Sequence, residues 1–261
     1  MRLEAGNGIV RVGLAPGAGG RLASLEVAGL ELLRPAGPDP IRWGCYPMAP
    51  FAGRVRRGRF RFRGREYALP CRMPPHAIHG TVFDRPFEVL GPGELRCDLG
   101  PEWPFRGALH ERVSVGARHV RLELVLTAEE PFPASLGWHP WFRRRLERGG
   151  SARLHLDAAA MYRRDEEGIP DGTLVPPPPG PWDDCFTGLR TTPVVEWPGA
   201  LRLRLGSDAT CFVVYDEPAD ALAVEPQTAP PDALNRMPRV VAPGRPLRLG
   251  LTLEVEGIDP P

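Results

Sequence analysis

The chain has 261 residues, of which 42% are apolar and 25% charged, a balance that suits a globular protein with a sizeable core. Its formal net charge is +1, which disfavours a polyanionic partner such as nucleic acid. All 33 basic residues are arginine. A Schiff-base aldolase, a pyridoxal phosphate enzyme and a P-loop nucleotide-binding protein are therefore excluded, because each needs a lysine amine.

Turn-forming residues and cysteines narrow the class further. The 30 glycines and 33 prolines make up nearly a quarter of the chain, so we expect many turns and few long helices. The five cysteines have irregular spacings, which favour free thiols in a reducing compartment over disulfides or a zinc site. The sequence shows no signal peptide and no apolar segment of membrane-spanning length. We therefore expect a soluble cytoplasmic protein that does not associate with membranes.

Short stretches of alternating apolar and polar residues dominate the chain. In chain order they predict strands over residues 9–14, 22–27, 154–156, 201–205, 212–215, 222–224 and 247–255. Two hairpins are also predicted, one over residues 58–69 with a turn at Gly64, and one joining residues 113–115 to 120–126. The arginines between positions 54 and 65 then form the solvated face of a strand pair, which we favour over a nucleic-acid patch.

Helical patterns are scarce. No 12-residue segment keeps a 3.6-residue period without glycine or proline, so any helix should be short. The proline-rich tract at residues 176–181 reads as an extended loop, since strand-like patterns continue on both sides. Turn spacings of roughly 8 to 12 residues are typical of a β-sandwich or barrel. The sequence thus predicts one all-β domain over residues 1–261.

Three of the six histidines lie in segments suited to a cavity mouth. His76 and His79 belong to P-P-H-A-I-H-G, and His139 belongs to S-L-G-W-H-P-W-F. We interpret both segments as loops, which commonly hold functional side chains on a rigid scaffold. The alternative for each of the three histidines is a purely structural role. No histidine spacing indicates a metal site. The other three histidines lie in predicted strands and are interpreted as ordinary strand residues: His110, His119 and His155.

Two acidic segments complete the candidate chemistry. Glu225 ends the apolar stretch 222–224, where partial desolvation would raise its pKa toward the range of a general base. The alternative is a solvated carboxylate at the start of a loop. Asp183 and Asp184 lie between Trp182 and Phe186, a composition that suits sugar binding. A simple Asx turn and a glycosidase carboxyl pair are the alternatives.

Taken together, the order and spacing of these segments resemble the aldose 1-epimerase (galactose mutarotase) family. The segments that carry the resemblance are G-G-R-L-A-S-L, P-F-A-G-R-V-R-R-G, H-A-I-H-G, G-W-H-P-W-F, D-D-C-F-T-G and V-E-P-Q-T-A-P-P-D-A-L-N-R. The resemblance implies an antiparallel β-sandwich of the galactose mutarotase-like supersandwich type, with few short helices. It also implies an isomerase that interconverts the α and β anomers of a small-molecule aldose without a metal or other cofactor.

The resemblance also implies roles for individual residues. Glu225 corresponds to the general base and His139 to the general acid. We expect the two groups to lie on opposite sides of a bound sugar, and we expect the carboxylate to raise the pKa of the imidazole. The substrate-binding positions correspond to His79, Arg54 and Asp183, and Trp141 replaces a common tyrosine as a wall of the site. The chain departs from the family pattern at Gly53, commonly Asn, and at Thr81, often Gly. These two departures bear on which sugar is bound.

Three other functions compete with a mutarotase of neutral sugars. The first is epimerisation of a phosphorylated or sulfonated sugar, with Arg56, Arg57 or Arg72 binding the anion. The second is a sugar-binding module of the same fold without turnover. The third is a glycosidase using Asp183 and Asp184, which we rank last because adjacent residues on a strand point to opposite faces.

Overall fold

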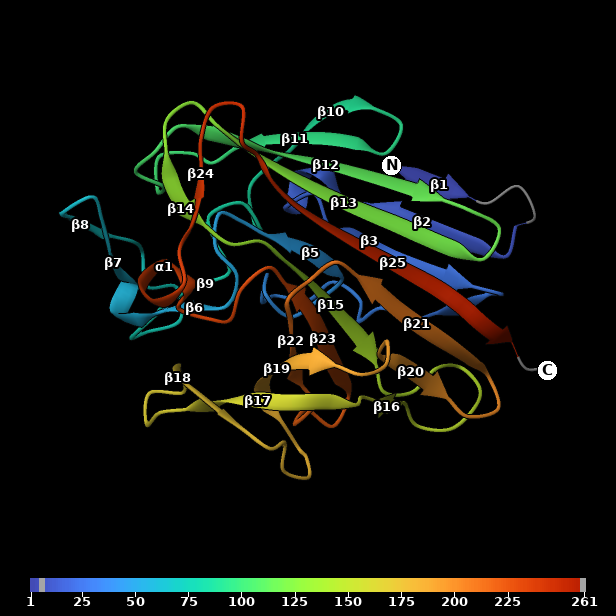
Figure 1. Cartoon of the computed structure of the whole chain (residues 1–261). Coiled ribbons are helices and arrows are strands. Elements are labelled where there is room, and N and C mark those ends of the chain that lie inside the picture. Colours follow the sequence, from blue (N-terminus) through green and yellow to red (C-terminus); the bar gives the residue numbers. More distant parts are fainter. Residues whose placement is uncertain (5–7, 259–261) are drawn as a thin grey trace.

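A computed structural model of the chain describes residues 1–4 and 8–258. They form two large antiparallel sheets that pack on a shared apolar core, with smaller strand pairs at one end (Figure 1). The predicted antiparallel β-sandwich is therefore confirmed. Helical structure in these residues is limited to α1 (Ala233–Arg236) and two 3-10 turns, η1 (Pro16–Ala18) and η2 (Arg56–Gly58). None of these helices has the length and apolar character needed to span a membrane.

The first sheet has eleven strands. Its order is β1-β2-β3-β5-β15-β23-β22-β19-β17-β18, and β4 pairs with β3. The strands are β1 (Arg2–Glu4), β2 (Val10–Leu14), β3 (Leu22–Val27), β4 (Leu30–Glu31), β5 (Cys45–Met48), β15 (Gly137–Arg143), β17 (Ala158–Arg164), β18 (Pro170–Val175), β19 (Asp183–Leu189), β22 (Cys211–Tyr215) and β23 (Ala221–Gln227).

The second sheet has eight strands in the order β10-β11-β12-β13-β25-β21-β20-β16. They are β10 (Glu88–Gly91), β11 (Glu94–Asp98), β12 (Gly107–Val115), β13 (His119–Ala128), β16 (Arg153–His155), β20 (Val194–Trp197), β21 (Leu201–Ser207) and β25 (Leu247–Ile258). Three further pairs are β6 (Arg54–Val55) with β9 (Ala77–Ile78), β7 (Arg59–Phe62) with β8 (Arg65–Ala68), and β14 (Phe132–Ala134) with β24 (Arg239–Val241).

The predicted alternation explains how the sandwich closes. In β25 the residues Leu249, Leu251 and Leu253 are buried, while Arg248 and Glu254 are exposed. Such a strand packs one face against the core and leaves the other in water. The predicted hairpins are also present, as β7–β8 around Gly64 and β12–β13. The arginines of β7–β8 are exposed, as the solvated-face interpretation expected. Arg54 and Arg56 differ from it, because they lie in β6 and η2 outside this strand pair and are partly buried.

Two central strands differ from the sequence-based prediction. The segment around His139 was expected to be a loop, but it forms β15, with six consecutive buried residues. It shows no alternation because it is covered on both faces, so its pattern cannot be recognised by a period of two. Glu225 was placed at the end of a strand, but β23 continues through Gln227 and holds Glu225 inside the sheet.

Candidate active site

The register of the first sheet brings His139 and Glu225 together. β15 and β23 are antiparallel, and Gly137 pairs with Gln227. Because the register is the same two residues further along, His139 lies opposite Glu225. Side chains alternate between the faces of a strand, so Trp138 points into the core and His139 to the opposite face. The two candidate catalytic residues are thus cross-strand neighbours on one face.

Two prolines lie where the β15–β23 ladder is interrupted. Pro140 and Pro226 lack an N–H group, and no β15–β23 pairing is recorded between Gly137↔Gln227 and Trp141↔Ala223. Proline normally disrupts a central strand. Here the missing donors fall in the unpaired stretch, and β23 still pairs with β22 along its other edge. The interruption coincides with the position of the histidine–glutamate pair.

The pair is in direct contact and almost fully buried. His139 Nε2 lies 3.2 Å from Glu225 Oε1, and each side chain is 4% exposed. Burial raises the pKa of Glu225 well above its usual range and lowers the pKa of His139 to about 3. The expectation that Glu225 would raise the pKa of its histidine partner was therefore wrong, because desolvation is the largest cause of both shifts and penalises the charged form of each group.

The geometry also corrects the expected placement of the pair. We expected the two groups on opposite sides of a bound sugar, but they share one wall of the cavity. The two oxygens that an acid–base pair must serve in a cyclic aldose are both bonded to its anomeric carbon. Adjacent catalytic groups therefore match adjacent reacting atoms.

Gln227 is a site residue that the sequence analysis missed. Its Nε2 donates a hydrogen bond of 3.1 Å to Glu225 Oε2, and the side chain is fully buried. This leaves Glu225 with one oxygen toward His139 and one toward an amide. A two-residue period along β23 would have placed Gln227 on the same face as Glu225.

Two aromatic rings fix the imidazole of His139. The Tyr46 ring stacks on it with centroids 4.7 Å apart, and the Trp141 ring stacks on it at 5.1 Å. Both aromatic side chains donate to one acceptor, the Ile41 carbonyl: Tyr46 Oη at 3.0 Å and Trp141 Nε1 at 2.7 Å. Trp141 thus lines the cavity, and Tyr46 is a second support for the imidazole that the sequence analysis missed.

His79 adds a second imidazole beside the first. Its ring meets that of His139 edge to face, with centroids 4.9 Å apart. Burial lowers the pKa of His79 well below its usual range, and His139 and Arg54 lower it further. Gly80 makes this placement possible, because a Cβ there would lie 1.9 Å from the Ala49 carbonyl oxygen. The H-G dipeptide therefore allows the close approach of two backbone segments.

Arg54 and Asp183 lie together on the cavity wall. Arg54 Nη2 donates to Asp183 Oδ2 at 3.2 Å, and the two side chains are 24% and 20% exposed. They come from β6 and from the first residue of β19. Such a pair offers both hydrogen-bond donors and acceptors to the hydroxyl groups of a ligand.

These side chains surround one cavity of about 190 Å³. All six of the predicted site residues line this cavity. Its lining comprises Ile41, Arg42, Gly53, Arg54, Met73, Ile78, His79, His139, Trp141, Asp183, Val213, Tyr215, Glu217, Glu225, Gln227 and Pro231.

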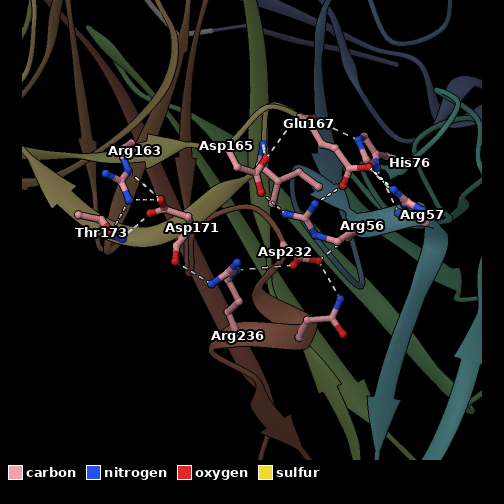
Figure 2. A network of polar contacts seen from close by, with 12 residues as sticks. Arg56, Arg57, His76, Arg163, Asp165, Glu167, Asp171, Thr173, Asp232 and Arg236 are labelled. Carbon is pink, nitrogen blue, oxygen red and sulfur yellow. Dashed lines mark hydrogen bonds and ion pairs between the residues drawn. The ribbon is translucent and has the colours of Figure 1, made fainter.

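The three arginines considered for anion binding do not line this cavity. Arg56 and Arg57 are bonded to acidic side chains of the β17–β18 turn (Figure 2). Arg72 pairs with Asp84 and Glu102. Their charges are neutralised locally, which leaves them poorly placed to hold a charged substituent of a ligand in the cavity.

His76 and Asp184 lie outside the cavity lining. His76 Nδ1 accepts a hydrogen bond from the Arg57 backbone N–H at 3.1 Å, which is a structural role. Asp184 is bonded by Arg164 at 2.8 Å. A glycosidase needs two carboxyl groups that flank one bond, and the adjacent aspartates do not provide that arrangement.

Of the two departures from the family pattern, one faces the cavity. Gly53 lines it with a φ of +68°, and a Cβ there would meet Pro231 at 2.8 Å. An asparagine at position 53 would therefore clash with Pro231. The close packing of Pro231 against the backbone thus requires glycine at this position. Thr81 does not line the cavity, because its hydroxyl donates to the buried Leu99 carbonyl at 2.8 Å.

Fold and site together define a class: an antiparallel β-sandwich with a buried histidine–glutamate pair in an aromatic-walled cavity. A sequence model of the aldose 1-epimerase family matches residues 4–253. The chain belongs to the aldose 1-epimerase family.

Individual proteins are similar to this chain over most of its length. The chain is 26% identical to the uncharacterized protein YphB of Escherichia coli K12, over 86% of this chain and 89% of YphB. A galactose mutarotase-like protein from Clostridium acetobutylicum has a similar fold, with a TM-score of 0.84, 16% identity, and coverage of 98% of this chain and 95% of that chain. The GalM/aldose epimerase homologue from C. elegans gives a TM-score of 0.81, 15% identity and 99% coverage of both chains.

Proposed function

We propose that the protein is an aldose 1-epimerase that interconverts the α and β anomers of a free aldohexose. The observation that carries the proposal is the buried contact of 3.2 Å between His139 Nε2 and Glu225 Oε1 in the cavity. Burying two titratable groups costs desolvation free energy. In a family of sugar epimerases, a role in proton transfer best explains why this pair is buried. The same pair argues against a sugar-binding module without turnover.

In the proposed reaction, Glu225 removes the proton of the anomeric hydroxyl while His139 protonates the ring oxygen. The bond between the anomeric carbon and the ring oxygen breaks, and the open-chain aldehyde forms. Rotation about the adjacent carbon–carbon bond exposes the other face of the aldehyde. The ring closes as both proton transfers run in reverse, which returns the two groups to their starting protonation.

The pair must hold one proton between its two members for this reaction. Burial favours the neutral form of each group in the free cavity, with the proton on Glu225. The short contact lets that proton pass to His139 when a substrate hydroxyl stabilises the carboxylate. Each proton transfer to or from a positioned group typically contributes about 10²- to 10⁴-fold to the rate.

We further propose that the surrounding side chains hold the sugar. Arg54 donates to adjacent hydroxyls, and Asp183 accepts from them. His79 contacts the ring oxygen region, and Trp141 forms an apolar wall. Ring faces commonly pack on aromatic side chains in sites of this kind. A neutral sugar is favoured because the arginines at positions 56, 57 and 72 are paired outside the cavity. The two arginines that line the cavity are also paired with carboxylates, Arg42 with Asp39 and Arg54 with Asp183.

Polarimetry of freshly dissolved α-D-glucose and α-D-galactose tests the proposal. The wild-type protein should speed the approach to the equilibrium rotation, and Glu225→Gln and His139→Asn should each lower kcat by about 10²-fold or more. A matched control is the exposed pair His155–Glu196, which has a 2.5 Å contact outside the cavity. His155→Asn and Glu196→Gln should leave the rate unchanged. Failure of the wild-type protein to accelerate either sugar, or near-normal rates in the cavity variants, would refute the proposal.

A further inference from the structure

Arg54 and Asp183 belong to segments that are far apart in the chain, and their mutual contact alone does not fix them. Asp183 Oδ2 accepts from two arginines, Arg54 at 3.2 Å and Arg164 at 3.1 Å. Arg164 also reaches Asp184 through its Nε at 2.8 Å. Arg164 does not line the cavity, so it bonds Asp183 from the side away from the cavity.

The buried Asp232 forms hydrogen bonds with the backbone on both sides of Val55, the residue after Arg54. The Asp232 N–H donates to the Arg54 carbonyl at 2.7 Å, and Asp232 Oδ1 accepts from the Arg56 N–H at 3.0 Å. The Asp232 side chain is only 3% exposed. The two bonds fix the path of the chain immediately after Arg54.

The side chain of Arg56 continues the connection to the β17–β18 turn. Its guanidinium bonds Asp165 and Glu167, both within that turn (Figure 2). Asp165 in turn accepts the backbone N–H groups of Glu167 and Ile169 at 3.0 and 3.1 Å. The turn is thus closed on itself and held against η2.

These contacts form a ring that closes on the cavity. From Arg54 it runs through Asp183 to Arg164, along the chain to Asp165, across to Arg56 and back to Arg54. Every member is less than about a third exposed, apart from Arg164 at 34%. Charged groups at such burial are screened less by salt than those on an open surface. A closed ring holds a geometry better than separate pairs, because the backbone links Arg164 to Asp165 and Arg54 to Arg56, so each of the three ion pairs limits the movement of the others.

We propose that Asp232, Arg56 and Arg164 are positioning residues, which hold Arg54 and Asp183 in the orientation that binds the sugar. This inference rests on the proposed function, since it assigns a role relative to the proposed sugar contacts. The three residues touch neither the cavity nor the histidine–glutamate pair. Their loss should therefore raise KM and leave kcat nearly unchanged.

Asp232 allows a sharp test because of its backbone. Its φ is +64°, a conformation that asparagine and glycine tolerate better than other residues. Asp232→Asn keeps an acceptor for the Arg56 N–H, whereas Asp232→Gly removes it without adding backbone strain. We expect Asp232→Gly to raise KM by about tenfold, with kcat within about threefold of wild type, and Asp232→Asn to restore most of the affinity.

Arg164 has a matched control in its chain neighbour. Arg164→Met removes both bonds to the aspartates and should also raise KM by about tenfold. Arg163 points to the β18 side of the hairpin, where it bonds Asp171 and Thr173 (Figure 2). Arg163→Met should leave KM at the wild-type value.

The measurements are the mutarotation kinetics of each variant at 25 °C and its urea unfolding curve. Unchanged KM in both Asp232→Gly and Arg164→Met would overturn the inference, even if both variants were less stable, because a purely structural role predicts only the stability loss. Arg54→Ala separates the two proposals. If it raises KM while the positioning variants do not, the inference fails and the proposed function stands. If the wild-type protein shows no mutarotation, the proposed function itself fails.

Discussion

At the scale of single residues, burial decides the protonation of the candidate catalytic pair. An exposed glutamate beside a histidine would lose its proton to the imidazole near neutral pH. Inside the sheet, desolvation raises the pKa of Glu225 well above its usual range and lowers that of His139 to about 3. The pair therefore keeps a single proton between the lowered pKa of His139 and the raised pKa of Glu225, and it titrates as a unit.

The first prediction concerns the pH dependence of kcat/KM. The reactive pair takes up a second proton only near the lowered pKa of His139, and it loses its one proton as the pH rises through the raised pKa of Glu225. We expect no loss of kcat/KM as the pH falls from 7 to 5.5, after subtraction of the buffer-catalysed rate. An acidic limb centred near 6.5, the ordinary histidine pKa, would contradict this account.

The identity of the candidate residues could be found from local sequence, but their partners could not. Glu225 and His139 stand in short motifs that resemble those of the family. Tyr46 lies in a segment without a recognisable motif, and its stacking on His139 depends on the pairing of β5 with β15. Gln227 could have been predicted as a site residue, because it lies two residues after Glu225 and side chains two apart on a strand share one face.

At the scale of elements, one buried arginine organises the segment beneath the aromatic rings. Arg21 is 1% exposed, and its guanidinium donates to the carbonyls of Ala18, Pro40, Trp43 and Phe83. Two of these carbonyls flank Ile41, the acceptor for both Tyr46 and Trp141. The arginine therefore supports the rings that hold His139 without reaching the cavity.

The second prediction follows from these four carbonyls. Arg21→Met leaves buried acceptors without donors, and each such group costs about 1–3 kcal/mol. We expect the free energy of unfolding to fall by about 3 kcal/mol or more, as measured by urea denaturation. Arg59→Met is the control, because Arg59 is exposed and pairs with Glu66 at the surface, where such pairs contribute about 1 kcal/mol or less. Equal losses in the two variants would contradict the role given to Arg21.

Several elements with one solvated face were predictable, whereas two buried strands that contain proline were not. β25 and the β7–β8 and β12–β13 hairpins appear where alternation and turn residues placed them. β5 and β15 are buried along nearly their whole length and contain proline. Period and propensity both argue against a strand in such segments, and the surrounding sheet outweighs them.

At the scale of the whole molecule, a buried carboxyl outside the candidate site lies between the sheets. Glu111 of β12 is 2% exposed, and neither of its carboxylate oxygens has a hydrogen-bond partner among the residues that the structure describes. Burial raises its pKa well above the usual range, and the nearby Cys45 thiol has its pKa raised by burial and by Glu111. Glu111 is therefore protonated in the folded protein at pH values where the unfolded chain is ionised.

The third prediction concerns stability against pH. Above pH 4.5 the folded protein keeps a proton on Glu111 that the unfolded chain releases, so this carboxyl lowers stability as the pH rises toward its folded-state pKa. Relative to wild type, Glu111→Met should gain about 1.4 kcal/mol per pH unit over that range. Urea unfolding at pH 5, 6 and 7 measures the difference. A difference that does not change with pH would show that Glu111 is not protonated in the fold.

The local order of residues was sufficient to predict an all-β chain, its exposed hairpins and the residue types at the site, because alternation and turn chemistry act over a few neighbours. The contact between His139 and Glu225, the ring of charges behind Arg54 and the burial that sets the protonation states depend on how distant strands align. Strand register is a long-range property, set by the packing of both sheets at once. For that reason the chemistry of this cavity emerges from the assembled sandwich rather than from any one segment.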